Sequence, residues 1–193
     1  IFFLFYNLSS LPHIQPSEEI NIFIFALSYI LIDSRRFGLL LATAAVGAAV
    51  KTTIIFIVPI YFIFSILTRR TWTRTILETS ILASVIGAIA VGIALYYSGP
   101  RDYLGGFWQY AYNTKQIAKL IPQSFPFIFI SLIPMTCIFI SWKKQPIIIQ
   151  ATALVCPLFV IGHYLISRVE EFRTFMPLAL TLFIGILIFS RQL

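Results

Sequence analysis

A long apolar stretch from Ala42 to Tyr61 is interrupted by one charged residue, Lys51. An ammonium group at the centre of a lipid bilayer costs roughly 2.5–3.5 kcal/mol on insertion scales. Lys51 is therefore expected either at a membrane face, between two short apolar segments, or paired inside a helix bundle. We favour the membrane face, because the other charges of the chain then follow a consistent pattern.

Composition supports a membrane location for the rest of the chain. Of 193 residues, 59% are hydrophobic and 11% are charged, whereas about a quarter of the residues of a soluble domain are charged. We therefore predict an all-α, polytopic transmembrane helix bundle, integral to a membrane, with the bacterial inner membrane favoured. The net charge of +7 lies in short clusters between apolar runs, so it indicates no nucleic-acid partner. Cys137 and Cys156 lie within apolar runs, which favours small buried side chains over a disulfide or a metal site.

The apolar runs predict about seven membrane segments within one transmembrane domain covering residues 1–193. A short stretch before the first segment is interpreted as the end of a helix, so we expect the true N-terminal part to be missing. Ser17 is the predicted N-cap of the first full segment, and Pro59 is a predicted kink in the third. The segments are 20–32, 37–50, 54–67, 76–97, 125–141, 147–167 and 175–190.

Aromatic residues between the fourth and fifth segments predict a short interfacial helix over residues 103–120. Tyr103, Phe107, Tyr110 and Ala111 recur at helical spacing, and Trp108 and Tyr112 widen the apolar face. Lys115 and Lys119 among them suit a helix lying in the headgroup layer. The alternative is a covering loop with an aromatic belt and no ligand.

Alternation of the segments predicts the orientation. With Glu18 and Glu19 outside, eight cations fall inside and six outside. The inner cations form dense pairs in short loops, where the positive-inside rule has most force. The inner set is Arg35, Arg36, Arg69, Arg70, Arg74, Lys143, Lys144 and Arg191, and the outer set is Lys51, Arg101, Lys115, Lys119, Arg168 and Arg173.

Two outer constellations are candidates for binding. At Lys51-Thr52-Thr53, a lysine point charge and two hydroxyls suit a phosphate, although a snorkelling lysine between two helices explains the same pattern. The turn from Arg168 to Arg173 also contains Glu170 and Glu171, which is costly at a membrane edge unless the charges pair or bind something. The alternative is a solvated loop whose charges cancel. His163 is a supporting candidate for a polar outer pocket, with an interfacial side chain as the alternative.

These residues resemble motifs of polytopic glycosyltransferases of the GT-C fold, which use polyprenyl-phosphate sugars. The family's lysine-containing apolar segment with a Pro-x-Tyr ending corresponds to Val50-Lys51-Thr52-Thr53-Ile54 through Pro59-Ile60-Tyr61. Its Glu-x-Arg-x-x-x-Pro turn corresponds to Glu171-Phe172-Arg173 through Pro177. Thr52 stands where a glutamate is usual. The family's catalytic acid lies in a first outer loop upstream of anything matched here, so the catalytic residue is unassigned.

The resemblance implies an inverting glycosyl transfer in which Lys51, Arg173 and Arg168 face a lipid phosphate at the outer membrane face. Thr52, Thr53, Glu170, Glu171 and His163 would then be supporting polar groups. A divalent metal ion is the one cofactor left open, and no metal ligand is assigned.

A non-catalytic membrane subunit is the main alternative, because Ala42, Ala45, Gly47, Ala48 and Ala49 form a small-residue face suited to a protein partner. A small-molecule transporter fits less well, since neither paired broken helices in symmetric halves nor buried acids are visible.

Overall fold

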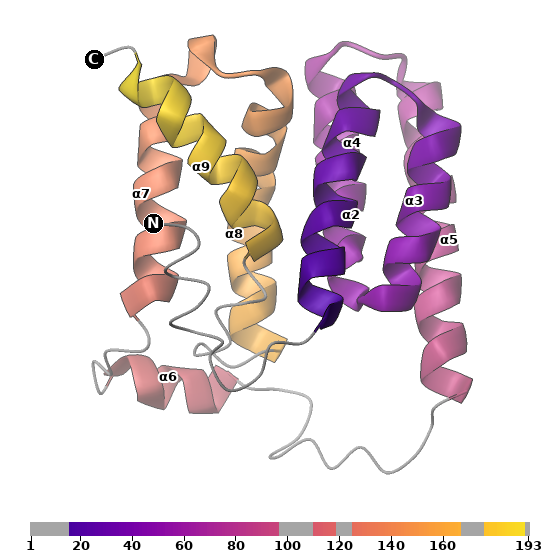
Figure 1. Cartoon of the computed structure of the whole chain (residues 1–193), viewed down its shortest axis with the longest axis horizontal. Helices are drawn as coiled ribbons and strands as arrows, with labels where there is room; N and C mark the ends of the chain where they lie inside the picture. The colour runs from indigo at the N-terminus through magenta and orange to yellow at the C-terminus, as the bar shows by residue number, and fades with distance from the viewer. Residues whose placement is uncertain (1–15, 97–109, 119–124, 167–175, 192–193) are drawn as a thin grey trace. The chain divides into compact units, whose positions relative to one another are not determined.

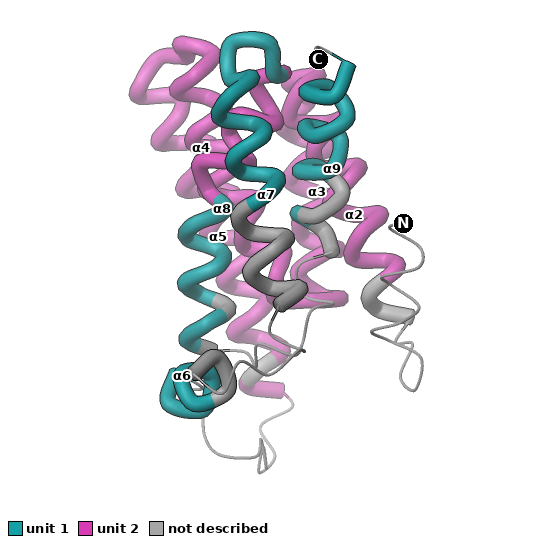
Figure 2. The backbone as a smooth tube through the Cα atoms, turned by 90° about the vertical axis from the view of Figure 1, so that its left-hand side faces the viewer, with its two compact units in different colours: residues 1–14, 100–145, 156–193 teal, residues 15–99, 146–155 magenta. Residues whose placement is uncertain are grey.

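The computed structural model describes residues 16–96, 110–118, 125–166 and 176–191. Within these ranges all regular structure is helical, as predicted. The contacts divide the chain into two compact units (Figure 2). Unit 2 contains residues 15–99 and 146–155, and unit 1 contains the remainder. Each unit is described separately below.

Unit 2 is built on four antiparallel helices (Figure 1). Each helix packs against two others in a closed ring, because α2 contacts α3, α3 contacts α5, α5 contacts α4, and α4 contacts α2. Its centre is filled by apolar side chains that are at most 2% exposed, such as Phe25, Leu40, Ile60 and Leu82. The helices are α2 (Pro16–Asp33), α3 (Phe37–Val50), α4 (Ile57–Leu67) and α5 (Trp72–Tyr96).

The chain passes from α3 to α4 through a short 3-10 helix, η1 (Thr52–Phe56). Gly47 on α3 permits a close approach there. A Cβ atom on Gly47 would lie 2.8 Å from Ile54 Cγ1 of η1 and 2.9 Å from Ile24 Cγ2 of α2. Side chains that close overlap, so the absence of a side chain at Gly47 allows three elements to meet.

The other end of unit 2 carries two turns with the same backbone geometry. After α2, Arg35 has φ 57°, its N–H donates to Ile32 O at 3.1 Å, and Arg36 N–H donates to Leu31 O at 3.0 Å. After α4, Arg69 has φ 54°, with equivalent bonds to Ile66 and Ser65. Both are Schellman turns, in which glycine is the usual left-handed residue. Here arginine occupies that position twice.

Unit 1 contains α6 (Tyr110–Ala118), α7 (Phe125–Ile140), η3 (Trp142–Lys144), the second half of α8 (Ile147–Ile166) and α9 (Met176–Ser190). Helix α7 packs against α9. At the turn after α7, Gln145 Nε2 donates to Ser141 Oγ at 2.6 Å and to Gly185 O of α9 at 3.0 Å. These two bonds tie the turn to α9.

Most predicted segment limits agree with the helices, and the predicted 37–50 segment matches α3. Two local predictions are wrong. Helix α2 begins at Pro16, so Ser17 lies in the first turn rather than at the N-cap. Proline is favoured at the first helical position because its missing N–H has no helical partner there. Pro59 likewise lies in the first turn of α4, after η1, so it does not kink this helix.

One described stretch is both long and apolar enough to cross a bilayer: residues Trp72–Ile93 of α5, with mean hydropathy 2.1. The other apolar helices identified in the described ranges are shorter, at 10–17 residues: Phe37–Val50, Thr52–Leu67, Ile147–Gly162 and Thr181–Ser190. The all-helical prediction is confirmed for the described residues. Because only one described stretch has the length of a membrane span, the number of spans stays a prediction.

Replacing Gly47 tests the close approach of α2, α3 and η1. We expect Gly47→Ala to lower the free energy of unfolding by about 1–2 kcal/mol, since an added methyl group overpacks this contact. Gly87→Ala in α5 is the matched control, because a Cβ there meets nothing within 4 Å and alanine favours a helix interior. Thermal denaturation of the purified chain in detergent checks both variants. Equal stability of the two would contradict the close packing at Gly47.

Candidate functional site

The predicted break at Lys51 is present in the structure. Helix α3 ends at Val50, and Lys51 has an extended backbone with φ −158° and ψ 134°. Its N–H donates to Gly47 O at 2.8 Å. The side chain of Lys51 is half-buried and that of Thr52 is exposed. Because the helices alternate in direction, this break lies at the end of unit 2 opposite Arg35 and Arg69.

Thr53, by contrast, is used within the bundle. Asn21 of α2, which is 0% exposed, donates from Nδ2 to Thr53 Oγ1 at 3.1 Å. Asn21 Oδ1 is buried with no hydrogen-bond partner among the described residues. Asn21 therefore places a polar amide against Thr53, the residue that follows the exposed Thr52. This contact was not predicted from the sequence.

The structure joins only part of the predicted site. Lys51, Thr52 and Thr53 lie together at the α3–η1 junction. The turn with Arg168, Glu170, Glu171 and Arg173 lies outside the described residues. His163 belongs to α8, and its side chain is likewise outside the described part. The predicted convergence of two outer cations therefore stays a prediction.

A second polar cluster lies near the opposite end of unit 2. The carboxylate of Glu78 on α5 accepts hydrogen bonds from the Tyr61 hydroxyl, from Arg70 Nη1 at 3.0 Å and from Arg74 Nε at 2.9 Å. Arg70 Nη1 also donates to the Tyr61 hydroxyl at 2.7 Å, and its guanidinium lies 5.6 Å from the Tyr61 ring centroid. These four residues, called the Glu78 cluster below, link α4, the turn at Arg69 and α5.

Burial indicates that the Glu78 cluster has a structural role. The side chains of Arg70 and Glu78 are 9% and 10% exposed, whereas that of Arg74 is 64% exposed. A buried carboxylate is tolerated when it is paired and hydrogen-bonded, and here both oxygens are occupied. The sequence contained one signal for it, the i, i+4 spacing of Arg74 and Glu78. The participation of Tyr61 and Arg70 had no sequence signal.

The described part of the predicted interfacial helix, α6, docks by a polar contact. Asn113, which is 0% exposed, donates to Tyr164 O of α8 at 2.6 Å, and Thr114 and Tyr164 are joined through their hydroxyls. Tyr110 is 54% exposed and Ala111 is also exposed. The described contact with α8 is therefore made by Asn113 and Thr114, and the placement of this helix in a headgroup layer stays a prediction.

The predicted small-residue face of α3 divides into two parts. Gly47 and Ala48 are buried within unit 2, whereas Ala42 and Ala49 are exposed. In the described ranges, no three His, Cys, Asp or Glu side chains lie close enough together to hold a metal ion. The described residues therefore do not fit a divalent metal site, and no chemical step is assigned to one.

Removing the Glu78 charge tests the role of the Glu78 cluster. We expect Glu78→Gln to lower the free energy of unfolding of the purified chain by about 3 kcal/mol, because Arg70 is left buried without its counter-charge. Arg74→Ala is the control and should have a much smaller effect, because its side chain is mostly in solvent. Chemical denaturation in mixed micelles measures both. Equal losses for the two variants would argue against a buried ion pair.

Comparison with known proteins gives no further assignment. No protein-family model, no curated protein and no solved structure matches the chain. The interpretation of the site therefore depends on its own geometry. That geometry consists of a lysine at a helix break with an exposed threonine beside it, and of the Glu78 cluster near the other end of the same unit.

Proposed function

We propose that the chain is a multi-pass membrane protein that binds a polyprenyl-phosphate-linked sugar near Lys51, on the outer face of the membrane. Two observations support the proposal. The first is the distribution of polar and apolar side chains, which bears on membrane placement. The second is the position of Lys51, which bears on the ligand.

The helices of unit 2 bury several polar side chains within their apolar core and expose large apolar side chains on their outer surface. Asn21, Ser28 and Ser65 are each 0% exposed. Large apolar side chains face outward, with Phe23 66%, Ile30 64%, Val46 60% and Leu77 58% exposed. Many large exposed apolar side chains are unusual for a soluble monomer and are expected where lipid surrounds the helices.

Two further observations favour membrane placement. Only 17% of the membrane-length window of α5 is buried inside the structure, so this stretch is not a covered core helix within the chain itself. Pro134 and Pro157 lie inside α7 and α8. Proline inside a helix is tolerated in membrane proteins, where neighbouring helices compensate for the lost hydrogen bond.

The position of Lys51 is the observation that carries the ligand proposal. Within unit 2 the turn arginines occupy one end and Lys51 the other. If the arginine end is cytoplasmic, as the positive-inside rule favours, Lys51 lies at the outer headgroup level. An ammonium group there can donate to a lipid phosphate, and the exposed Thr52 hydroxyl adds a second donor. The sugar, the acceptor and the catalytic group are left unassigned.

A non-catalytic membrane subunit is the second candidate. It is favoured by the exposed part of α3, where Gly38 has open space around it and Ala42 and Ala49 are exposed. Small residues spaced along one helix surface allow a partner helix to approach closely. In that case the chain would copurify with a membrane partner and bind no polyprenyl phosphate.

Cysteine labelling tests the membrane placement of unit 2. In a chain with Cys137→Ala and Cys156→Ala, we introduce Thr52→Cys or Ser34→Cys at opposite ends of α3. Because the two ends should lie on opposite sides of the membrane, a membrane-impermeant maleimide added to intact cells should label only Thr52→Cys. Ser34→Cys should react only after the membrane is opened. Labelling of both sites in intact cells would refute the placement.

Binding measurements test the ligand. We expect Lys51→Ala to weaken binding of a polyprenyl-phosphate sugar to the reconstituted full-length protein by about 10- to 100-fold, since a charge-assisted hydrogen bond is lost. Lys51→Arg should retain part of the affinity, because it keeps a cationic donor. Arg36→Ala, an exposed cation at the other end of unit 2, is the matched control. Unchanged binding in Lys51→Ala would remove the proposed phosphate role.

A further inference from the structure

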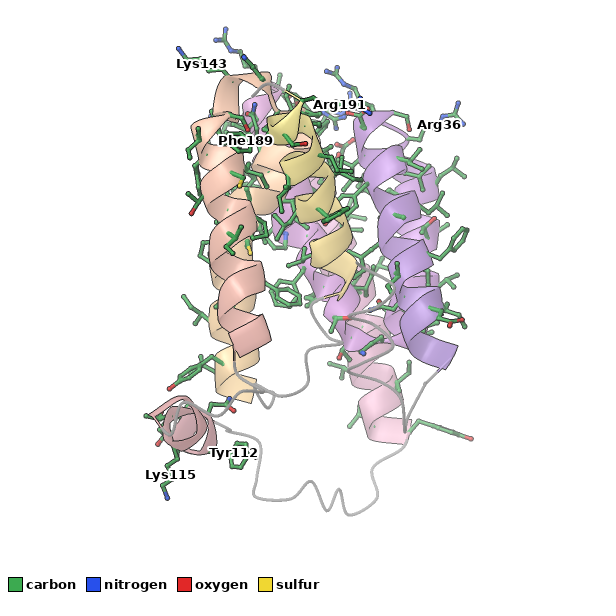
Figure 3. All side chains as sticks on the ribbon, turned by 60° about the vertical axis from the view of Figure 1, so that its left-hand side comes forward. Arg36, Tyr112, Lys115, Lys143, Phe189 and Arg191 are labelled. Carbon is green, nitrogen blue, oxygen red and sulfur yellow. The ribbon has the colours of Figure 1, made fainter. Side chains whose placement is uncertain are left out.

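A depression of about 560 Å³ opens at the end of unit 1 where α7 turns into α8. Its walls are formed by the last turn of α7 and by Phe189 of α9, and Lys143 and Lys144 stand at its rim. Figure 3 shows Lys143, Phe189 and Arg191 at this end of unit 1, with Tyr112 and Lys115 at the far end. Its volume lies within the range of sites that bind small organic groups.

One wall of the depression is a flat aromatic surface. The rings of Phe139 and Trp142 are stacked, with centroids 5.3 Å apart and an interplanar angle of 11°. Tryptophan favours the headgroup level of a membrane, where its ring contacts apolar chains and its N–H stays near polar groups. The stack therefore suits the boundary between a headgroup and an acyl chain.

The polar side chain in the wall of the depression is hydrogen-bonded within the protein. Ser141 Oγ donates to Cys137 O at 2.8 Å and accepts from Gln145 Nε2, which also binds Gly185 O. These bonds anchor the α7–α8 turn to α9, so the lysines project from a fixed support. Lys143 and Lys144 are both exposed, and among the described residues no acidic side chain lines the depression.

Large apolar side chains are also exposed on the two helices that form the depression. Ile140 at the end of α7 is 70% exposed, and Leu187 and Ile184 on α9 are 48% and 45% exposed. An acyl chain lying there would cover apolar side chains while its headgroup met the two lysines. A cationic rim above an apolar surface matches the charge and shape of an anionic lipid.

We propose that this depression binds the phosphodiester headgroup of an acidic phospholipid, with Lys143 and Lys144 as the phosphate-binding cations and Phe139 and Trp142 as the contact for the upper acyl chain. Basic groups between helix ends on the cytoplasmic side are suited to such headgroups. The inference depends on the membrane placement proposed above, but it is independent of Lys51 and of any glycosyl transfer.

The test uses the full-length chain with Trp72→Phe and Trp108→Phe, which leaves Trp142 as the one tryptophan of the three. Phosphatidylglycerol with brominated acyl chains is titrated into the protein in phosphatidylcholine nanodiscs, and quenching of Trp142 fluorescence is followed. Lys143→Ala with Lys144→Ala should weaken the apparent affinity by about 10- to 30-fold, since each lysine near a membrane surface contributes to anionic-lipid binding. Lys143→Arg with Lys144→Arg should retain it.

Three controls separate the possible outcomes. Lys115→Ala, an exposed lysine at the other end of unit 1, should leave quenching unchanged. Inorganic phosphate at millimolar concentration should not displace the lipid, and displacement would show a free-phosphate site and overturn the proposal. Quenching that is insensitive to both lysines would also overturn it. Alkaline carbonate extraction of cell membranes is run in parallel, because a chain released by carbonate would refute the membrane placement itself.

Discussion

The carboxylate of Glu78 determines how the arginine end of unit 2 is assembled. Glu78 is the one acidic residue in the membrane-length window of α5, and it accepts hydrogen bonds from Tyr61, Arg70 and Arg74. An unpaired carboxylate among apolar helices would be expensive to bury. Pairing it with Arg70 allows the charged turn to fold back against the bundle, so that α4 and α5 remain in contact to their ends.

The two ends of unit 2 terminate their helices in different ways. At one end, Arg35 and Arg69 occupy the left-handed position of the turns, although an L residue costs roughly 1–2 kcal/mol there relative to the right-handed conformation. Arginine at a position that favours glycine places charge directly at the helix end. At the other end, Lys51 is extended, η1 follows it, and Asn21 satisfies Thr53. The first end is strongly cationic, whereas the second end combines Lys51 and uncharged polar groups with the acidic first turn of α2, which contains Glu19.

Predictions from the sequence succeeded where a single helix decides the outcome. The limits of α3 and the break at Lys51 follow from apolar length and from the cost of placing a charge among apolar side chains. Predictions failed where neighbouring elements decide. Pro59 was expected to kink a helix, but packing of η1 near Gly47 places it in the first turn of α4. The docking of α6 on α8 was not predicted from the sequence, because it depends on the Tyr164 carbonyl of α8 accepting a hydrogen bond from Asn113.

By itself the sequence determined the helical class of the described segments, their approximate limits and the placement of the turn cations at helix ends. Each of these depends on local composition and on the desolvation cost of a charge, and both can be evaluated along the chain. Only the tertiary structure decided which polar groups meet: Asn21 with Thr53, Tyr61 with Glu78, and Gln145 with Gly185. These partners are separated in sequence, and periodicity within one helix carries no information about the facing residue of another. The angle and register at which two helices pack determine that pairing.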